Sequence, residues 1–148
     1  MSIVTLAACG GGGSDEPADK YVGKWLSKCY SYVAQDGNTY YTRQLVNMVK
    51  ESAGVLQASS TAENAYSDGA CSNLLSTFSS PYNNNKINIG KETTFAGIKA
   101  EEIAYTDLVT NKAFPGFATA DSTQYFIVTY NVGSFPSGWG KGAPYGKQ

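Results

Sequence analysis

Alternating hydrophobic and polar positions run through most of the chain and predict strands rather than helices. Residues 21–34 form the first such run, and an Asp36-Gly37 pair, typical of hairpin turns, follows it. The same two-residue period continues in residues 39–50 and again in residues 55–60. We therefore expect three antiparallel strands in this part of the chain.

The pattern is less decisive between residues 59 and 80, where small polar residues surround Leu74, Leu75 and Phe78. This short apolar stretch fits a helix or a strand, and periodicity does not distinguish the two. Beyond it we expect two or three further short strands separated by glycines. Their apolar positions are Ile87, Ile89, Phe95, Ile98, Ile103, Tyr105 and Leu108.

Residues 124–132 form the most strongly β-patterned run of the chain. Strand alternation places Phe126, Val128 and Tyr130 on one face, and Tyr125 and Ile127 on the other. We expect this strand to lie deep in the sheet. From about residue 133 onward five glycines and two prolines interrupt the pattern, which predicts an irregular tail.

A chain of 148 residues has room for one domain with a core of its own. Seven or eight short strands in sequence are most economically closed into a barrel, because closure removes exposed strand edges. We therefore expect an all-β fold over residues 20–148, in which a single antiparallel meander closes into a barrel. A β-sandwich is the alternative.

Charge and composition narrow the function classes. Eleven basic and twelve acidic residues give a net charge of −1, so no broad positive field is available to bind nucleic acid. Histidine, the commonest general base and metal ligand, is absent from the sequence. Adjacent Glu101 and Glu102 would point to opposite faces of a strand, and Asp107 beside Thr106 fits a turn. We expect no catalytic residues, no metal site, no cofactor and no enzymatic activity.

The first residues carry a processing signal. Leu6, Ala7, Ala8 and Cys9 resemble the lipobox of bacterial lipoproteins, with residues 1–8 as a truncated signal peptide. The resemblance implies a diacylglycerol on the Cys9 sulfur, cleavage before Cys9, and a stable lipid anchor in the membrane. Gly10 stands where an aspartate would resemble an inner-membrane retention signal, which favours the outer membrane, with the protein facing the periplasm. Residues 9–19 are glycine-rich and then acidic, and we expect them to form a flexible tether outside the core.

Three cysteines are present. If lipid occupies Cys9, then Cys29 and Cys71 remain as a pair in a compartment that permits disulfides. Two buried free thiols are the alternative. We expect the disulfide, which would close a loop of about 43 residues and contribute about 4 kcal/mol.

Gly23 and Trp25, at the start of the first predicted strand, resemble the G-x-W motif of lipocalin-like barrels. In that family the tryptophan closes one end of the barrel, and a basic residue late in the chain packs over it. The only arginine here, Arg43, lies early, so that partner is not located. The resemblance implies a ligand cavity, for which Trp25, Tyr30, Tyr32 and Tyr40 are the candidate binding residues. The tyrosines also suit half-buried strand positions.

Three functions remain open. We expect a lipid-anchored binding module for a small apolar ligand. The alternative is a protein-binding lipoprotein, such as a lysozyme-type inhibitor or an envelope assembly accessory, which would use a loop at residues 83–85 or 135–139. An enzyme would need a polar cleft that brings together Glu92, Glu102, Asp107 or a lysine, and no spacing in the sequence assembles one.

Overall fold

A computed structural model describes residues 15–78 and 85–148 of the chain. The residues of the lipobox resemblance and residues 83 and 84 therefore lie outside the described part. Within it the chain forms one short 3-10 helix and ten strands, which are η1 (Asp19–Tyr21), β1 (Gly23–Leu26), β2 (Tyr30–Val33), β3 (Thr39–Ser52), β4 (Val55–Tyr66), β5 (Leu74–Phe78), β6 (Asn85–Phe95), β7 (Ile98–Asp107), β8 (Lys112–Ala120), β9 (Gln124–Thr129) and β10 (Tyr145–Lys147). The ambiguous stretch around Leu74 is thus a strand.

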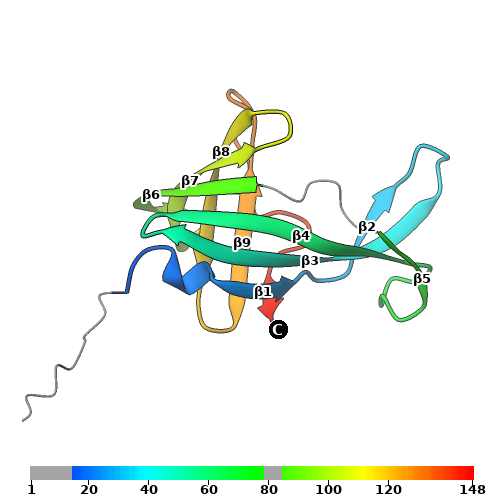
Figure 1. Ribbon diagram of the computed structural model, residues 1–148. Coiled ribbons are helices and arrows are strands. Elements are labelled where there is room, and N and C mark those ends of the chain that lie inside the picture. Colours follow the sequence, from blue (N-terminus) through cyan, green and yellow to red (C-terminus); the bar gives the residue numbers. More distant parts are fainter. Residues whose placement is uncertain (1–14, 79–84) are drawn as a thin grey trace, which may run out of the picture.

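Eight of these strands close into an antiparallel barrel (Figure 1). Around the barrel the order is β1, β3, β4, β6, β7, β8, β9 and β10, so neighbours follow one another along the chain, and β10 pairs with β1 to complete the ring. The expected closed meander is confirmed, and its form is consistent with a lipocalin-like barrel. A sandwich is excluded because the pairing is continuous around the ring.

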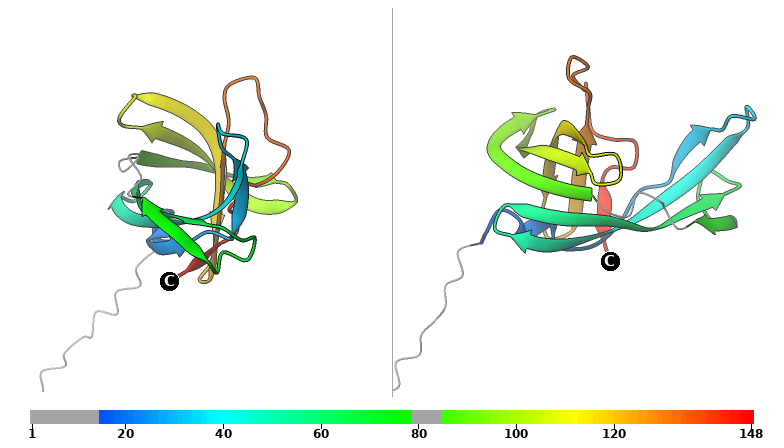
Figure 2. Two further views of the ribbon diagram at one scale, coloured as in Figure 1. Left: turned by 90° about the vertical axis from the view of Figure 1, so that its right-hand side faces the viewer. Right: turned by 45° about the horizontal axis from the view of Figure 1, so that its top comes forward.

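Beside the barrel the sheet continues as a projection, which we call the wing. It consists of β2, the first half of β3, the second half of β4, and β5, in the order β2-β3-β4-β5. Figure 2 shows the wing extending away from the barrel. The wing forms because β3 and β4, at 14 and 12 residues, extend beyond the end of the barrel.

The single strand expected over residues 21–34 is wrong, because residues 27–29 interrupt it. β1 and β2 both pair with β3, but between them the Ser27 hydroxyl accepts a hydrogen bond from the N–H of Gln44 (2.8 Å). Next to it, the N–H of Lys28 donates to the carbonyl of Gly142 (3.0 Å). The chain therefore leaves the ladder where the barrel ends and rejoins it in the wing.

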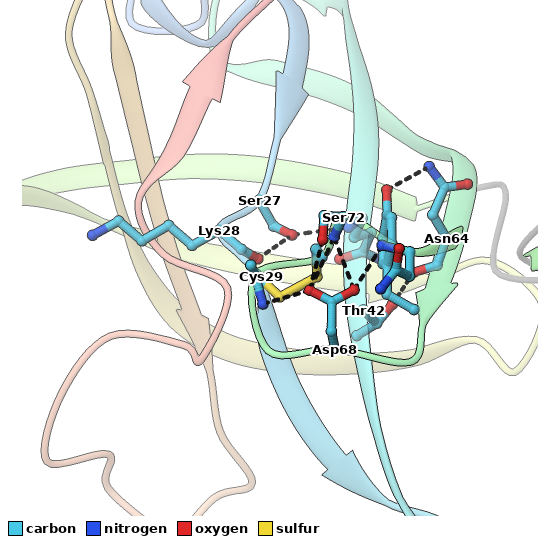
Figure 3. The surroundings of a disulfide bond; sticks show 12 residues. Ser27, Lys28, Cys29, Thr42, Asn64, Asp68 and Ser72 are labelled. Carbon is cyan, nitrogen blue, oxygen red and sulfur yellow. Dashed lines mark hydrogen bonds between the residues drawn. A yellow bond between two sulfur atoms is a disulfide. The ribbon is translucent and has the colours of Figure 1, made fainter. Parts of the chain in front are cut away.

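A disulfide between Cys29 and Cys71 fastens the wing, as expected. Cys29 precedes β2, Cys71 lies in the loop between β4 and β5, and their Cα atoms are 5.8 Å apart. Figure 3 shows Asp68 beside this bond. The Asp68 carboxylate accepts hydrogen bonds from the backbone N–H groups of Ala70, Ser72 and Asn73, which fixes the loop that presents Cys71.

The core occupies the interior of the barrel, where alternate residues of each strand point inward. The predicted alternation in β9 is confirmed, since Tyr125 and Ile127 face the core. On the outer face Phe117 and Val128 belong to a second cluster, covered by Trp139 of the segment after β9. β8 and β9 approach each other closely at Gly116, where a Cβ atom would lie 2.2 Å from the Val128 carbonyl oxygen.

Both ends of the described chain depart from the expectations. Residues 131–144 are irregular, but Tyr145–Lys147 forms β10, so the tail supplies the strand that closes the barrel. At the other end Ala18, expected in the tether, is fully buried in the core. It is held there because its N–H donates to the Ala53 carbonyl (3.0 Å) and because Lys50 forms ion pairs with Glu16 and Asp19. The folded body therefore begins at about residue 16.

Candidate functional site

One end of the barrel is sealed by aromatic and charged side chains. Trp25 is fully buried there, and its indole N–H donates to the Tyr21 carbonyl (2.8 Å). The Tyr21 hydroxyl donates to Glu101 (2.5 Å), which also pairs with Lys20. Burial, together with this carboxylate, raises the pKa of Tyr21 far above its usual range.

A cation completes this closed end. The ammonium group of Lys147 lies 5.2 Å from the centre of the Trp25 ring, within the range of a cation–π interaction. Gly23 makes room for it, since a Cβ atom at this position would lie 3.2 Å from Lys147 Cε, and its φ of +134° favours glycine. Lys147, near the end of the chain, is therefore the basic residue that packs over Trp25.

The remaining interior of the barrel contains a cavity of about 430 Å³ that opens at the other end. Its apolar lining comes from inward positions of β3, β4, β6 and β9, namely Val46, Met48, Ala58, Ile87 and Ile127. Residues 140–142 form part of its rim, where the N–H of Gly140 donates to the Ile127 carbonyl (3.2 Å). The cavity is therefore a mostly apolar chamber with one closed end.

Four tyrosines, Gln44 and Asn85 supply most of the polar groups of the lining. The Tyr145 hydroxyl donates to Gln44 Oε1 (3.1 Å). Burial raises the pKa of Tyr105 to about 12 and raises those of Tyr30, Tyr125 and Tyr145 as well. At neutral pH all four hydroxyl groups are therefore protonated and able to donate a hydrogen bond.

Of the four predicted ligand-binding residues, only Tyr30 lines the cavity. Trp25 is buried in the closed end instead. Tyr32 and Tyr40 lie on the wing, with their rings 5.9 Å apart, and the Tyr40 hydroxyl donates to Asp36 (3.2 Å). The physical reason is the break at residues 27–29, which carries β2 out of the barrel.

Sequence reasoning missed Tyr105, Tyr125 and Tyr145 as residues of the cavity. The alternation of β9 already separated Tyr125 from the outward Phe126 and was the available signal. For Tyr145 the sequence offered none, because the glycines and prolines around it concealed β10.

The acidic residues considered for catalysis do not line the cavity. Glu92 pairs with Lys99 (2.7 Å) and Glu102 with Lys91 (3.4 Å), both among partly or fully exposed side chains. Asp107 accepts hydrogen bonds from the hydroxyl of Thr110 and the N–H of Val109, and these bonds lower the pKa of its carboxyl group. Across the two described ranges no group of acidic or cysteine side chains is arranged to hold a metal ion.

The two loops predicted to bind a protein partner, residues 83–85 and 135–139, are only partly within the described ranges. Asn85 is the first residue of β6 and is buried at the cavity, not on a protruding loop. In residues 135–139, Trp139 packs against Phe95, with ring centres 4.9 Å apart, whereas Phe135 is 69% exposed. Among the described helical residues there is no segment long and apolar enough to cross a membrane.

The barrel, its closed end and its cavity define the candidate site. Comparisons with models of protein families, with curated proteins and with solved structures found no match for this chain. The barrel architecture therefore describes the fold, and the cavity is the feature from which a function can be inferred.

Proposed function

We propose that this protein is a lipid-anchored binding protein of the bacterial cell envelope that holds a small, largely apolar molecule inside its barrel. The observation that carries this proposal is the cavity of about 430 Å³ above a sealed end. Small-molecule sites are typically concave, mostly apolar and about 300–1,000 Å³ in volume. Barrels of about eight strands are also just wide enough to hold one small ligand.

The volume limits the size of the ligand. At ~30 Å³ per non-hydrogen atom, the share of a water molecule in the liquid, the cavity would hold about 14 such atoms. That size corresponds to a bicyclic ring system or a short acyl chain. A full-length phospholipid would not fit inside.

Binding without catalysis is the activity that this lining supports. Lys141 at the rim is the one ionic side chain among the cavity-lining residues in the described part of the chain. General acid–base catalysis depends on a positioned histidine, carboxylate, lysine, tyrosine or cysteine whose pKa lies near the working pH, whereas the pKa values of the tyrosines in this lining are raised above their usual range. Tyrosines and amides instead suit the orientation of a bound molecule through hydrogen bonds.

The proposed location is the outer membrane, facing the periplasm, with a lipid on Cys9. The disulfide between Cys29 and Cys71 supports an oxidising compartment. Residues 16–21 enter the barrel at its closed end, so an anchor preceding them would leave the cavity mouth free. Replacing Cys9 with alanine is expected to release the protein into the soluble periplasmic fraction, and unchanged membrane retention would contradict the location.

Ligand binding has its own test. N-phenyl-1-naphthylamine, a neutral dye that fluoresces in apolar surroundings, is expected to bind the purified protein with a stoichiometry of one. Its 17 non-hydrogen atoms exceed the ~14 that the cavity encloses, so we expect part of the dye to lie in the open mouth. Native mass spectrometry of protein purified from its own envelope is expected to show an added small mass. A protein that binds no dye and carries no added mass would contradict the proposal.

A second candidate function, protein binding, is favoured by the wing. Val33 is 70% exposed, Leu75 56% and Phe78 53%. β2 and β5 are the outer strands of the wing, and neither contains a charged residue or proline, the usual protection of an edge. This candidate predicts that an envelope protein crosslinks to photoreactive groups placed at residues 33 and 75. Crosslinks at these positions together with an empty cavity would favour it over ligand binding.

A further inference from the structure

One tyrosine of the cavity lining, Tyr125, has a hydroxyl group that is not paired with another side chain of the described ranges. Tyr125 is 1% exposed, and its ring is held between Trp25, Tyr21 and Tyr145, with ring centres 5.7, 6.0 and 5.4 Å away. The other buried tyrosines of this cluster are paired, Tyr21 with Glu101 and Tyr145 with Gln44. The Tyr125 hydroxyl makes no hydrogen bond with any residue of the described ranges, although its side chain lines the cavity.

Such a hydroxyl group is costly beside a hydrocarbon. A buried donor without a partner destabilises a protein, and buried polar groups in native proteins are nearly always paired. The Tyr125 ring is 1% exposed and packs against Tyr21 and Trp25, and its side chain lines the cavity. The partner must therefore enter the cavity, as water or as a polar atom of the ligand.

The charges of the lining limit what this polar atom can be. Lys141, the cation noted at the rim, is exposed and belongs to the mouth rather than to the closed end. A carboxylate bound at the depth of Tyr125 would be buried without a counter-charge, which is strongly unfavourable. A protonated phenol next to a neutral oxygen carries no such penalty. The oxygen only needs to accept a hydrogen bond.

We infer that the ligand is a neutral compound, apolar except for a carbonyl or ether oxygen that accepts a hydrogen bond from the Tyr125 hydroxyl. This inference rests on the proposed binding function and narrows it. It disfavours plain hydrocarbons, which accept no hydrogen bond from the hydroxyl group, and carboxylates, which bring a charge to an uncharged site. Tyr30 of β2 and Tyr105 of β7 also line the cavity, whose aliphatic lining would contact the apolar remainder of the ligand.

Three compounds of nearly equal shape test this inference. 2-Acetylnaphthalene carries a carbonyl, 2-ethylnaphthalene has none, and 2-naphthoate carries a charge. Displacement of N-phenyl-1-naphthylamine measures the affinity of each. One net hydrogen bond is worth about 0.5–1.5 kcal/mol, so we expect the ketone to bind about two- to tenfold more tightly than the hydrocarbon. The carboxylate is expected to bind most weakly.

A single substitution tests the role of the hydroxyl group. Tyr125→Phe is expected to remove the preference for the ketone and to leave the affinity for 2-ethylnaphthalene within about twofold, because only the donor is lost. Tyr40→Phe on the wing removes a hydroxyl group outside the cavity and is expected to keep the preference. If Tyr125→Phe does not fold, the ranking of the three compounds on the unmodified protein still tests the inference.

The outcomes separate the inference from the proposed function. Three results would overturn the inference but not the proposed binding function. They are equal binding of ketone and hydrocarbon, a preference for the ketone that persists in Tyr125→Phe, and tightest binding of 2-naphthoate. If neither the dye nor any of the three compounds binds, the proposed function itself fails.

Discussion

Removing the disulfide by replacing Cys29 and Cys71 with alanine is expected to lower the free energy of unfolding by about 4 kcal/mol. The cysteines are 42 positions apart in the sequence, so their bond closes a loop of about 43 residues counting both. The chain-entropy relation, ΔS = −2.1 − 1.5R ln n, gives about −13 cal/mol/K for this loop. At 25 °C this amounts to the ~4 kcal/mol stated above.

The loop is well placed for an effect of this size. It contains β2, β3 and β4, and two of these strands belong to both the barrel and the wing. In the folded protein Cys71 is 7% exposed and lies in a loop that Asp68 fixes. The bond therefore joins two ordered segments, and its main effect is to restrict the unfolded chain. Without it, we also expect proteases to cleave the wing before the barrel, because the outer strands of the wing each have one partner strand among the described residues.

Urea unfolding at 25 °C, followed by tryptophan fluorescence, measures the difference. With a urea dependence of ~2 kcal/mol/M, a loss of about 4 kcal/mol shifts the midpoint by about 2 M. A reducing agent is expected to lower the stability of the unmodified protein to nearly that of the double variant. It is expected to leave the double variant unchanged, which serves as the control. A decrease of less than about 1 kcal/mol would refute the loop-closure reasoning.

Three further perturbations test the closed end, the strand contacts and the buried tyrosines. Lys147→Gln removes the cation above Trp25 and is expected to lower the free energy of unfolding by about 0.5–1 kcal/mol in urea, whereas Lys147→Arg preserves it. Gly116→Ala forces a Cβ atom against a backbone carbonyl and is expected to cost more than about 2 kcal/mol, compared with at most ~0.5 for Gly146→Ala, where the Cβ atom meets open space. Stability is expected to be constant between neutral pH and about pH 10 and to fall toward pH 12, because the folded state raises the pKa of Tyr105 to about 12 and so retains a proton that the unfolded chain releases. Unfolding measured at several pH values and tyrosinate absorbance check this sign, and an increase in stability above pH 10 would contradict it.

The barrel could be predicted from the sequence because its strands carry a two-residue period and apolar inward positions. β3, β4 and β9 follow this pattern closely. β8 was not located, since Pro115 and Gly116 interrupt the pattern within the strand. β10 was missed for a similar reason, because it is three residues long within a glycine-rich tail and forms only through its pairing with β1 and β9. Neither strand is specified by local propensity.

The wing and the cavity depend on information that a single strand pattern does not contain. Residues 30–33 have the same alternation whether they line a barrel or leave it. The break before them depends on two distant residues, because the Ser27 hydroxyl accepts a hydrogen bond from Gln44 and the Lys28 N–H donates one to Gly142. Of the aromatic residues predicted to line the cavity only Tyr30 does so, because the wall is assembled from strands up to about 100 residues apart, as in the Tyr145–Gln44 bond. Lys147 was missed because the search for a late basic partner of Trp25 considered only arginine.

The most direct test of a ligand-binding cavity is to fill it. Ala58 is 5% exposed and lines the cavity, and the phenyl ring of Ala58→Phe occupies about 180 Å³ at ~30 Å³ per atom. Ala104 is exposed on the outer face of β7, so Ala104→Phe adds the same ring outside the barrel and serves as the control. Titration with N-phenyl-1-naphthylamine is expected to show one site on the unmodified protein and on Ala104→Phe, and at least tenfold weaker binding on a folded Ala58→Phe variant. Equal dye affinity in all three proteins would contradict the account, because the dye would then bind outside the cavity.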